Sequence, residues 1–89
     1  MDAFRWNVWN IDHIGEHGVT PEEAEEVVVA AADPYPEKVG DEKFRIRGQT
    51  VVGRYLQVIY IIDPPRCIYV IHARDLTLNE RRLYRRRRK

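Results

Sequence analysis

Three β-like runs joined by short links constrain the fold of this chain more than any other feature. They span residues 43–48, 54–62 and 67–74. The first run alternates apolar and basic residues, as a strand with one covered face does. The middle run is apolar at both odd and even positions, which is typical of a central strand covered on both faces. Links this short join neighbouring antiparallel strands, so the runs predict an antiparallel meander.

A helix is predicted before the strands with an unusually clear start. Thr20-Pro21-Glu22-Glu23 is a capping box with proline at the first helical position and acids in the first turn. Apolar residues then follow at helical spacing, at positions 24, 27, 28 and 31. Asp33-Pro34-Tyr35-Pro36 is expected to end the helix, because residues before proline avoid the α region.

Two more helices are predicted, one at each end of the chain. Asn7 is a plausible N-cap for a helix through about His17, and Gly18 suits the left-handed position after its end. Thr77-Leu-Asn-Glu80 is a second capping box, which opens a basic C-terminal helix. Phe4–Trp6 is either a short edge strand or an anchoring segment, and residues 34–42 are expected to form a loop.

Together these elements predict a single α+β domain over residues 1–89. We expect two N-terminal helices, a three- to four-stranded antiparallel sheet and a C-terminal basic helix, with the helices packed on one face of the sheet. The 89 residues, of which 44% are hydrophobic, suffice for one core.

The charge of the chain is divided between its two halves. Residues 1–43 hold eleven acidic and three basic residues, a net charge of −8, whereas residues 44–89 hold three and twelve, a net charge of +9. A basic surface of this kind suits a polyanion such as RNA or DNA, and the alternative is a solvated arginine tail.

The single cysteine, Cys67, excludes an intramolecular disulfide. No apolar run approaches the roughly 20 residues that span a bilayer, and no signal-peptide pattern opens the chain, so we expect a cytoplasmic protein.

Arg54 and Arg74 are candidate phosphate ligands. Arg54 opens the second predicted strand and Arg74 closes the third, so antiparallel pairing is expected to bring both to one end of the sheet. Arginine grips phosphate through two hydrogen bonds and offsets the charge of a phosphorane. His72 has the parity of Arg74 and is expected on the same face. The alternative is that arginines at strand ends only maintain solubility.

Further candidates lie along the basic second half of the chain. Glu80 either closes its capping box or acts as a general base. Tyr84 either stacks on a nucleobase or packs beside Leu83 against the sheet. Arg45 and Arg47 either form the solvent face of their strand or extend a phosphate track.

His13-Ile14-Gly15-Glu16-His17 has the H-x-x-E-H spacing that supplies zinc ligands in some metalloproteases. Gly15 weakens the helix that would hold such ligands, and no downstream acidic helix offers a third. We therefore predict no metal site and no cofactor. A structural role is favoured for His13, whereas a structural and a catalytic role both stay open for His17.

The order and spacing of these motifs over nearly the full chain resemble the BrnT family of bacterial toxins. The resemblance implies a compact fold akin to RelE-type ribonucleases, endoribonuclease activity that arrests translation, and neutralisation by a DNA-binding antitoxin. It is carried by Phe4-x-Trp6, His17-Gly18-Val19-Thr20-x-Glu22-Glu23-Ala24-x-Glu26-Val27, Gly53-Arg54-x-Leu56-x-Val58 and Val70-Ile71-x-Ala73-Arg74-x-x-Thr77-x-x-Glu80-Arg81-Arg82-x-Tyr84.

Residue by residue, the resemblance points to Arg54, Arg74, Glu80, the pair Arg81 and Arg82, and His17. The chain departs from the family in a shorter segment after Trp6 that contains no lysine, and in His72, where a small Ser or Thr is expected. It therefore resembles a divergent member.

The sequence thus predicts an RNA-cleaving toxin that needs no metal. A base, Glu80 or a histidine, would deprotonate a ribose 2′-OH, and His72 or Tyr84 would protonate the leaving 5′-oxygen. The rival predictions are a non-catalytic RNA- or DNA-binding module and a protein-interaction module.

The expected partners are RNA, whether or not on the ribosome, and a cognate antitoxin; a dimer also stays open. The predicted catalytic residues are Arg54, Arg74, Glu80, His17 and His72, and the predicted RNA-binding residues are Arg45, Arg47, Arg81, Arg82, Tyr84 and Arg85.

Overall fold

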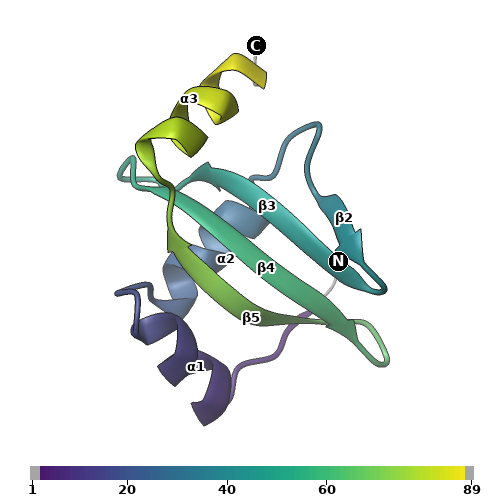
Figure 1. Cartoon of the computed structure of the whole chain (residues 1–89). Helices are drawn as coiled ribbons and strands as arrows, with labels where there is room; N and C mark the ends of the chain where they lie inside the picture. The colour runs from purple at the N-terminus through teal and green to yellow at the C-terminus, as the bar shows by residue number, and fades with distance from the viewer. Residues whose placement is uncertain (1–2, 88–89) are drawn as a thin grey trace.

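The computed structural model describes residues 3–87, which form three helices around one five-stranded sheet (Figure 1). Residues 88 and 89, the end of the predicted basic tail, lie outside the described residues, as do residues 1 and 2. In chain order the elements are β1 (Ala3–Phe4), α1 (Val8–Gly15), α2 (Pro21–Val29), β2 (Glu37–Gly40), β3 (Lys43–Gln49), β4 (Tyr55–Asp63), β5 (Cys67–Asp75) and α3 (Leu78–Arg87).

The sheet confirms the predicted meander and extends it by a strand at each edge. Its order is β1-β5-β4-β3-β2, with β2 to β5 antiparallel and β1 parallel to β5. The sheet is therefore mixed and has five strands, whereas the sequence predicted three or four antiparallel ones. The segment expected as a loop contains β2, whose mostly exposed residues give no apolar alternation. β1 ends at Phe4, so the edge-strand alternative for Phe4–Trp6 holds only for Phe4, and two residues are too few to give a periodic signal.

The hydrophobic core lies between one face of the sheet and helices α1 and α2. The sheet contributes alternate residues of its three long strands, and α1 and α2 contribute Ile14, Ala24 and Val27. The buried strand residues on this face include Ile46, Leu56, Val58, Val70 and Ala73. This burial is the main force that holds the two N-terminal helices against the sheet.

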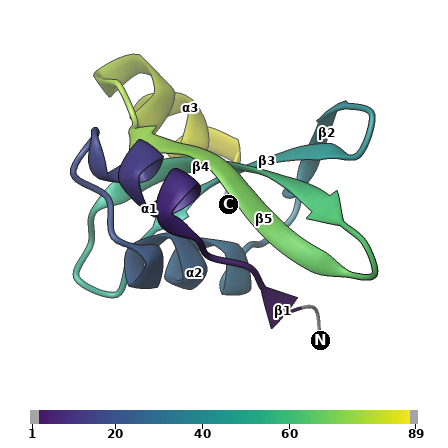
Figure 2. The same ribbon diagram turned by 90° about the horizontal axis from the view of Figure 1, so that it is seen from below.

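Helix α3 packs on the opposite face of the sheet, across the ends of the strands (Figure 2). Its Glu80 contacts Arg47 and Arg74, which alternate along β3 and β5 with the core residues Ile46 and Ala73. The prediction that all helices share one face is therefore wrong. The C-terminal helix carries too few apolar residues to join the core side and is held by polar and aromatic contacts instead.

The helix starts follow the predicted capping residues. Asn7 and Thr20 are the N-caps of α1 and α2, and each makes a reciprocal capping box with the residue three positions on. α1 ends at Gly15, earlier than predicted, and Gly18 takes the expected left-handed conformation with φ of +69°. Among residues 3–87, no helix combines the length and apolar character needed to cross a membrane.

Candidate functional site

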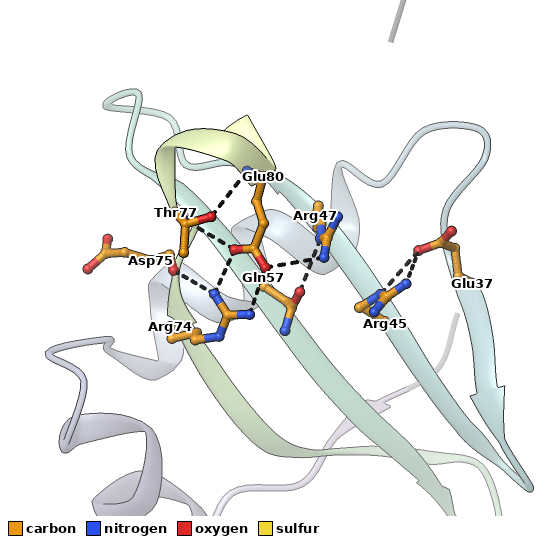
Figure 3. Close-up of polar contacts among 8 residues, drawn as sticks. All are labelled: Glu37, Arg45, Arg47, Gln57, Arg74, Asp75, Thr77 and Glu80. Carbon is orange, nitrogen blue, oxygen red and sulfur yellow. Dashed lines mark hydrogen bonds and ion pairs between the residues drawn. The ribbon is translucent and has the colours of Figure 1, made fainter. Parts of the chain in front are cut away.

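A carboxylate held between two arginines forms the centre of the polar face of the sheet (Figure 3). Arg74 donates from Nη1 and Nη2 to the two oxygens of Glu80 at 2.8 and 2.9 Å. Arg47 on β3 lies on the other side and donates from Nη2 to Glu80 Oε2 at 3.4 Å. Arg47 also donates through Nε to Oε1 of the buried Gln57 on β4, at 3.0 Å. The network thus joins three strands to the first turn of α3.

Glu80 also closes the predicted capping box of α3. The Thr77 amide donates to Glu80 Oε1 at 2.9 Å, and the Glu80 amide donates to Thr77 Oγ1 at 3.1 Å. Hydrogen bonding from Arg74, with further contributions from the Thr77 amide and the charge of Arg47, holds the pKa of Glu80 at about 2. A carboxylate with so low a pKa is a weak base at neutral pH, so this geometry favours the capping role over general-base catalysis.

Arg74 keeps part of its hydrogen-bonding capacity for a ligand. Its contacts to Glu80 and to the Asp75 carbonyl use Nη1 and Nη2. Its Nε makes no hydrogen bond to another residue within 3–87. Arginine presents donors along two edges of a planar group, so the edge that contains Nε can donate to a phosphate while the other edge donates to Glu80.

Arg54 has a different environment from Arg74, although both lie at the same end of the sheet. Its guanidinium donates to both oxygens of Asp75, to Glu23 in the first turn of α2, and to the carbonyls of Gly18 and His17. Hydrogen bonding to Asp75 raises the pKa of Arg54, and Glu23 adds to this effect. As expected, Arg54 and Arg74 lie at one end of the sheet, and both contact Asp75, Arg54 at its carboxylate and Arg74 at its carbonyl. Arg54 also ties α2 and the turn after α1 to the end of β5.

Three histidines, from α1, from the turn after it and from β5, lie close together. The ring of His72 lies 5.4 Å from that of His17 and 6.4 Å from that of His13, centroid to centroid. The strand register places His72 opposite Ile59 and Arg74 opposite Gln57, so His72 and Arg74 share one face of the sheet as predicted. Burial lowers the pKa of His72, and the nearby charges of His17, Arg74 and His13 lower it further.

Aromatic rings extend this histidine cluster along α1, and the sequence reasoning did not single them out. The Trp9 ring stacks on His13 at 5.0 Å and on Tyr69 at 6.2 Å. Trp9 is 55% exposed, which is high for a residue of its size. The i, i+4 spacing of Trp9 and His13 was a usable signal for their contact, but the approach of Tyr69 depends on how α1 docks on β5.

Two predicted RNA-binding arginines of α3 lie over the ring of Tyr55. The guanidinium carbons of Arg81 and Arg85 lie 4.5 and 5.3 Å from the ring centroid, and Arg85 Nε donates to the Tyr55 hydroxyl at 3.2 Å. The hydrogen bond from Arg85 lowers the pKa of Tyr55, and the charges of Arg85 and Arg81 act in the same direction. These cation–π contacts fix α3 on the sheet and keep a positive surface beside the Glu80 network.

The remaining predicted RNA-binding residues differ in how far their side chains are exposed to solvent. Tyr84 is buried against Tyr35 and Tyr55, which supports the packing alternative and removes its ring from contact with a nucleobase. Arg82 is exposed. Arg45 donates from Nε and Nη2 to Glu37 on β2, at 3.1 and 3.0 Å, and lies beyond the Glu80 network (Figure 3).

No group of three or more His, Cys, Asp or Glu side chains among residues 3–87 is arranged to hold a metal ion. Comparison of the chain with protein-family models, curated proteins and solved structures finds no match. The BrnT resemblance therefore stays a prediction.

Proposed function

We propose that this protein is an endoribonuclease that cleaves RNA by transphosphorylation, without a metal ion. The observation that carries the proposal is the His17–His72 pair, whose ring centroids lie 5.4 Å apart, on the face of the sheet that also carries Arg74. Two imidazoles and an arginine supply the three functions that this reaction requires, which are a base, an acid and a group that stabilises the charged phosphorane.

The environments of the two histidines suggest how their roles are divided. Because its pKa is lowered, His72 is neutral at pH 7 and can take the proton of a ribose 2′-OH. The 2′-oxygen then attacks the adjacent phosphorus, and the bond from phosphorus to the 5′-oxygen breaks. Exposed His17 gives a proton to the leaving 5′-oxygen. The products are a 2′,3′-cyclic phosphate and a free 5′-OH.

Arg74 is the group that we expect to contact the phosphate. Its Nε edge faces no partner among the described residues, while Glu80 holds the adjacent edge, formed by Nη1 and Nη2, at 2.8 and 2.9 Å. A guanidinium held in this way binds an anion without losing further side-chain freedom. Arg81, Arg82 and Arg85 on α3 would guide the neighbouring phosphates, and affinity should fall steeply with salt.

In the cell, this activity fits a toxin that arrests translation in the cytoplasm and is neutralised by a DNA-binding antitoxin. The support is the BrnT resemblance, whose Arg74-x-x-Thr77-x-x-Glu80 motif corresponds to the Arg74, Thr77 and Glu80 network. Inducible expression of the wild type beside Arg74→Ala tests this setting. Growth arrest with fragmented RNA in the wild type alone supports it, and normal growth with intact RNA at verified expression contradicts it.

Cleavage of single-stranded RNA by the purified protein, in excess chelator, tests the chemistry directly. The wild type should release 2′,3′-cyclic phosphate ends, detected by mass spectrometry. His72→Gln and His17→Gln should each lose about 100-fold or more in rate while RNA affinity changes little. Asp12→Asn, an exposed change on α1, is the matched control and should cleave normally. A wild-type activity that needs a divalent metal would contradict the mechanism.

One observation favours a second candidate function, RNA binding without cleavage. Arg47 and Arg74 are both already paired with Glu80, an arrangement that also suits a rigid basic surface. Under this alternative the wild type binds RNA in a salt-dependent manner and leaves it intact in the same assay. Removal of Arg82 and Arg85 would then weaken binding more than Arg74→Ala.

A further inference from the structure

The outer surface of α2 carries an acidic stripe that ends in an exposed valine. Glu22, Glu25, Glu26 and Val29 lie at i, i+3, i+4 and i+7, on the helix side opposite the buried Ala24 and Val27. The side chain of Val29 is 69% exposed. We call these four residues the acidic stripe. Val29 thus places an apolar group at the end of a row of three carboxylates.

The turn between β3 and β4 extends this apolar surface. Val51 and Val52 form its tip and are 86% and 88% exposed. The Val51 amide donates to Glu26 Oε1 at 3.0 Å, which fixes the tip against the acidic stripe. Turns normally carry Gly, Asn, Asp, Ser or Pro, and two adjacent exposed valines leave apolar surface in water. The acidic stripe and the valine turn therefore form one apolar surface with an acidic rim.

The outer surface of α3 has the complementary character. Leu78, Arg82 and Arg86 lie at i, i+4 and i+8, and we call them the basic stripe. All three are exposed, Leu78 by 70%, and Leu83 beside them is 41% exposed. The basic stripe faces away from Tyr84, which is buried between α3 and the sheet.

We propose that the acidic stripe of one copy of this chain binds the basic stripe of a second copy. In an antiparallel arrangement, Val29 meets Leu78 at one end and Glu22 meets Arg86 at the other, with the middle acids opposite Arg82. The spacings agree, because seven and eight residues of helix span about 10 and 12 Å. Antiparallel helices also place opposite ends of their dipoles together.

The occupant is a second copy because one chain carries both complementary surfaces. The acidic stripe carries three carboxylates and the basic stripe two guanidinium groups, so head-to-tail contact joins surfaces of opposite charge. Two different surfaces meet in this interface, so each added copy leaves one acidic and one basic stripe free. Association therefore continues beyond the dimer unless the chain of copies closes into a ring.

Sedimentation velocity at several protein concentrations tests the proposal. The wild type should form species larger than dimers at low salt and dissociate at about 1 M salt, where the screening length falls to about 3 Å. Val29→Lys and Leu78→Lys should each raise the apparent dissociation constant about tenfold or more, because each places an ammonium group against an apolar contact. Val39→Lys makes the same chemical change on exposed β2, outside both stripes, and should associate like the wild type.

Mixing the two disrupted variants separates this pairing from any other. Val29→Lys keeps its basic stripe and Leu78→Lys keeps its acidic stripe, so an equimolar mixture should form a 1:1 dimer that grows no further. The exchange of charges in Glu22→Arg/Arg86→Glu should restore association that either single change weakens.

Three results would overturn the proposal. They are a wild type that stays monomeric at low salt and about 0.5 mM protein, a Val29→Lys variant that assembles like the wild type, and a mixture that stays monomeric although the wild type assembles. The first of these is also the result expected if the acidic stripe serves only a different protein. Circular dichroism of each variant verifies that the comparison is made between folded chains.

Discussion

Replacement of Glu80 by glutamine is expected to remove a large part of the stability of the fold at neutral pH. Glutamine keeps the size of the side chain and its acceptor oxygen but loses the charge that Arg74 and Arg47 share. The pKa of Glu80 is about 2 in the folded protein against an ordinary value of 4.5. Since each pKa unit corresponds to about 1.4 kcal/mol, ionised Glu80 stabilises the fold by about 3 kcal/mol at pH 7.

The pH dependence of this effect provides a second check. Because the pKa is lowered on folding, the stabilisation is fully present above pH 4.5 and is lost as the pH falls through about 2. The difference between wild type and Glu80→Gln should therefore shrink from about 3 kcal/mol at pH 7 to about 1 kcal/mol at pH 3.

Urea denaturation followed by circular dichroism measures this difference at each pH, and thermal unfolding at pH 7 should show a loss of about 15 °C. The exposed Glu16→Gln is the matched control and should change the free energy of unfolding by less than about 0.5 kcal/mol. A free energy of unfolding for Glu80→Gln that lies within about 0.5 kcal/mol of the wild-type value at pH 7 would refute the reasoning. So would a difference that stays constant from pH 7 to pH 3.

Three further outcomes follow from the structure. Arg54→Ala should lower the free energy of unfolding, measured in urea, by about 2–3 kcal/mol, because Asp75 and Glu23 lose the cation that they share. If the variant instead keeps its stability and loses cleavage, the result would support the catalytic role that the sequence predicted for Arg54. In the pH profile of kcat/KM, cleavage should be lost as the pH falls through a midpoint below 6.5, since burial lowers the pKa of the proposed base His72; a midpoint above 6.5 would contradict that assignment. Gly53→Ala should cost about 1–2 kcal/mol in thermal unfolding, because Gly53 has φ of +96°, and an unchanged Tm would show that the turn relaxes.

Local signals in the sequence predicted most of the secondary structure. The capping residues Asn7, Thr20 and Thr77 each begin a helix, because a cap depends only on residues three positions away. The three long strands begin and end within one residue of the predicted bounds, since their apolar alternation is also local. β2 escaped prediction, and the edge-strand alternative for Phe4–Trp6 holds only for Phe4, because an edge strand with little buried surface has no such pattern.

The candidate site was less predictable because its contacts are long-range. His17 and His72 were singled out separately, but their approach depends on the docking of α1 against β5. Arg54 lies at the same end of the sheet as Arg74, as expected, but its carboxylate partners were not predicted because they lie 21 and 31 residues away in the chain. Which of several carboxylates an arginine meets is decided by tertiary packing, and residue type alone does not reveal it.

The carboxylate of Glu80 restricts which residues the chain can accept at this position during evolution. One oxygen accepts the Thr77 amide and starts α3, while both oxygens hold Arg74. Aspartate is one methylene shorter and cannot keep both sets of bonds in place, and glutamine has the length without the charge. Helix formation and arginine placement therefore cannot be altered separately here, and a change that loosens α3 also releases Arg74.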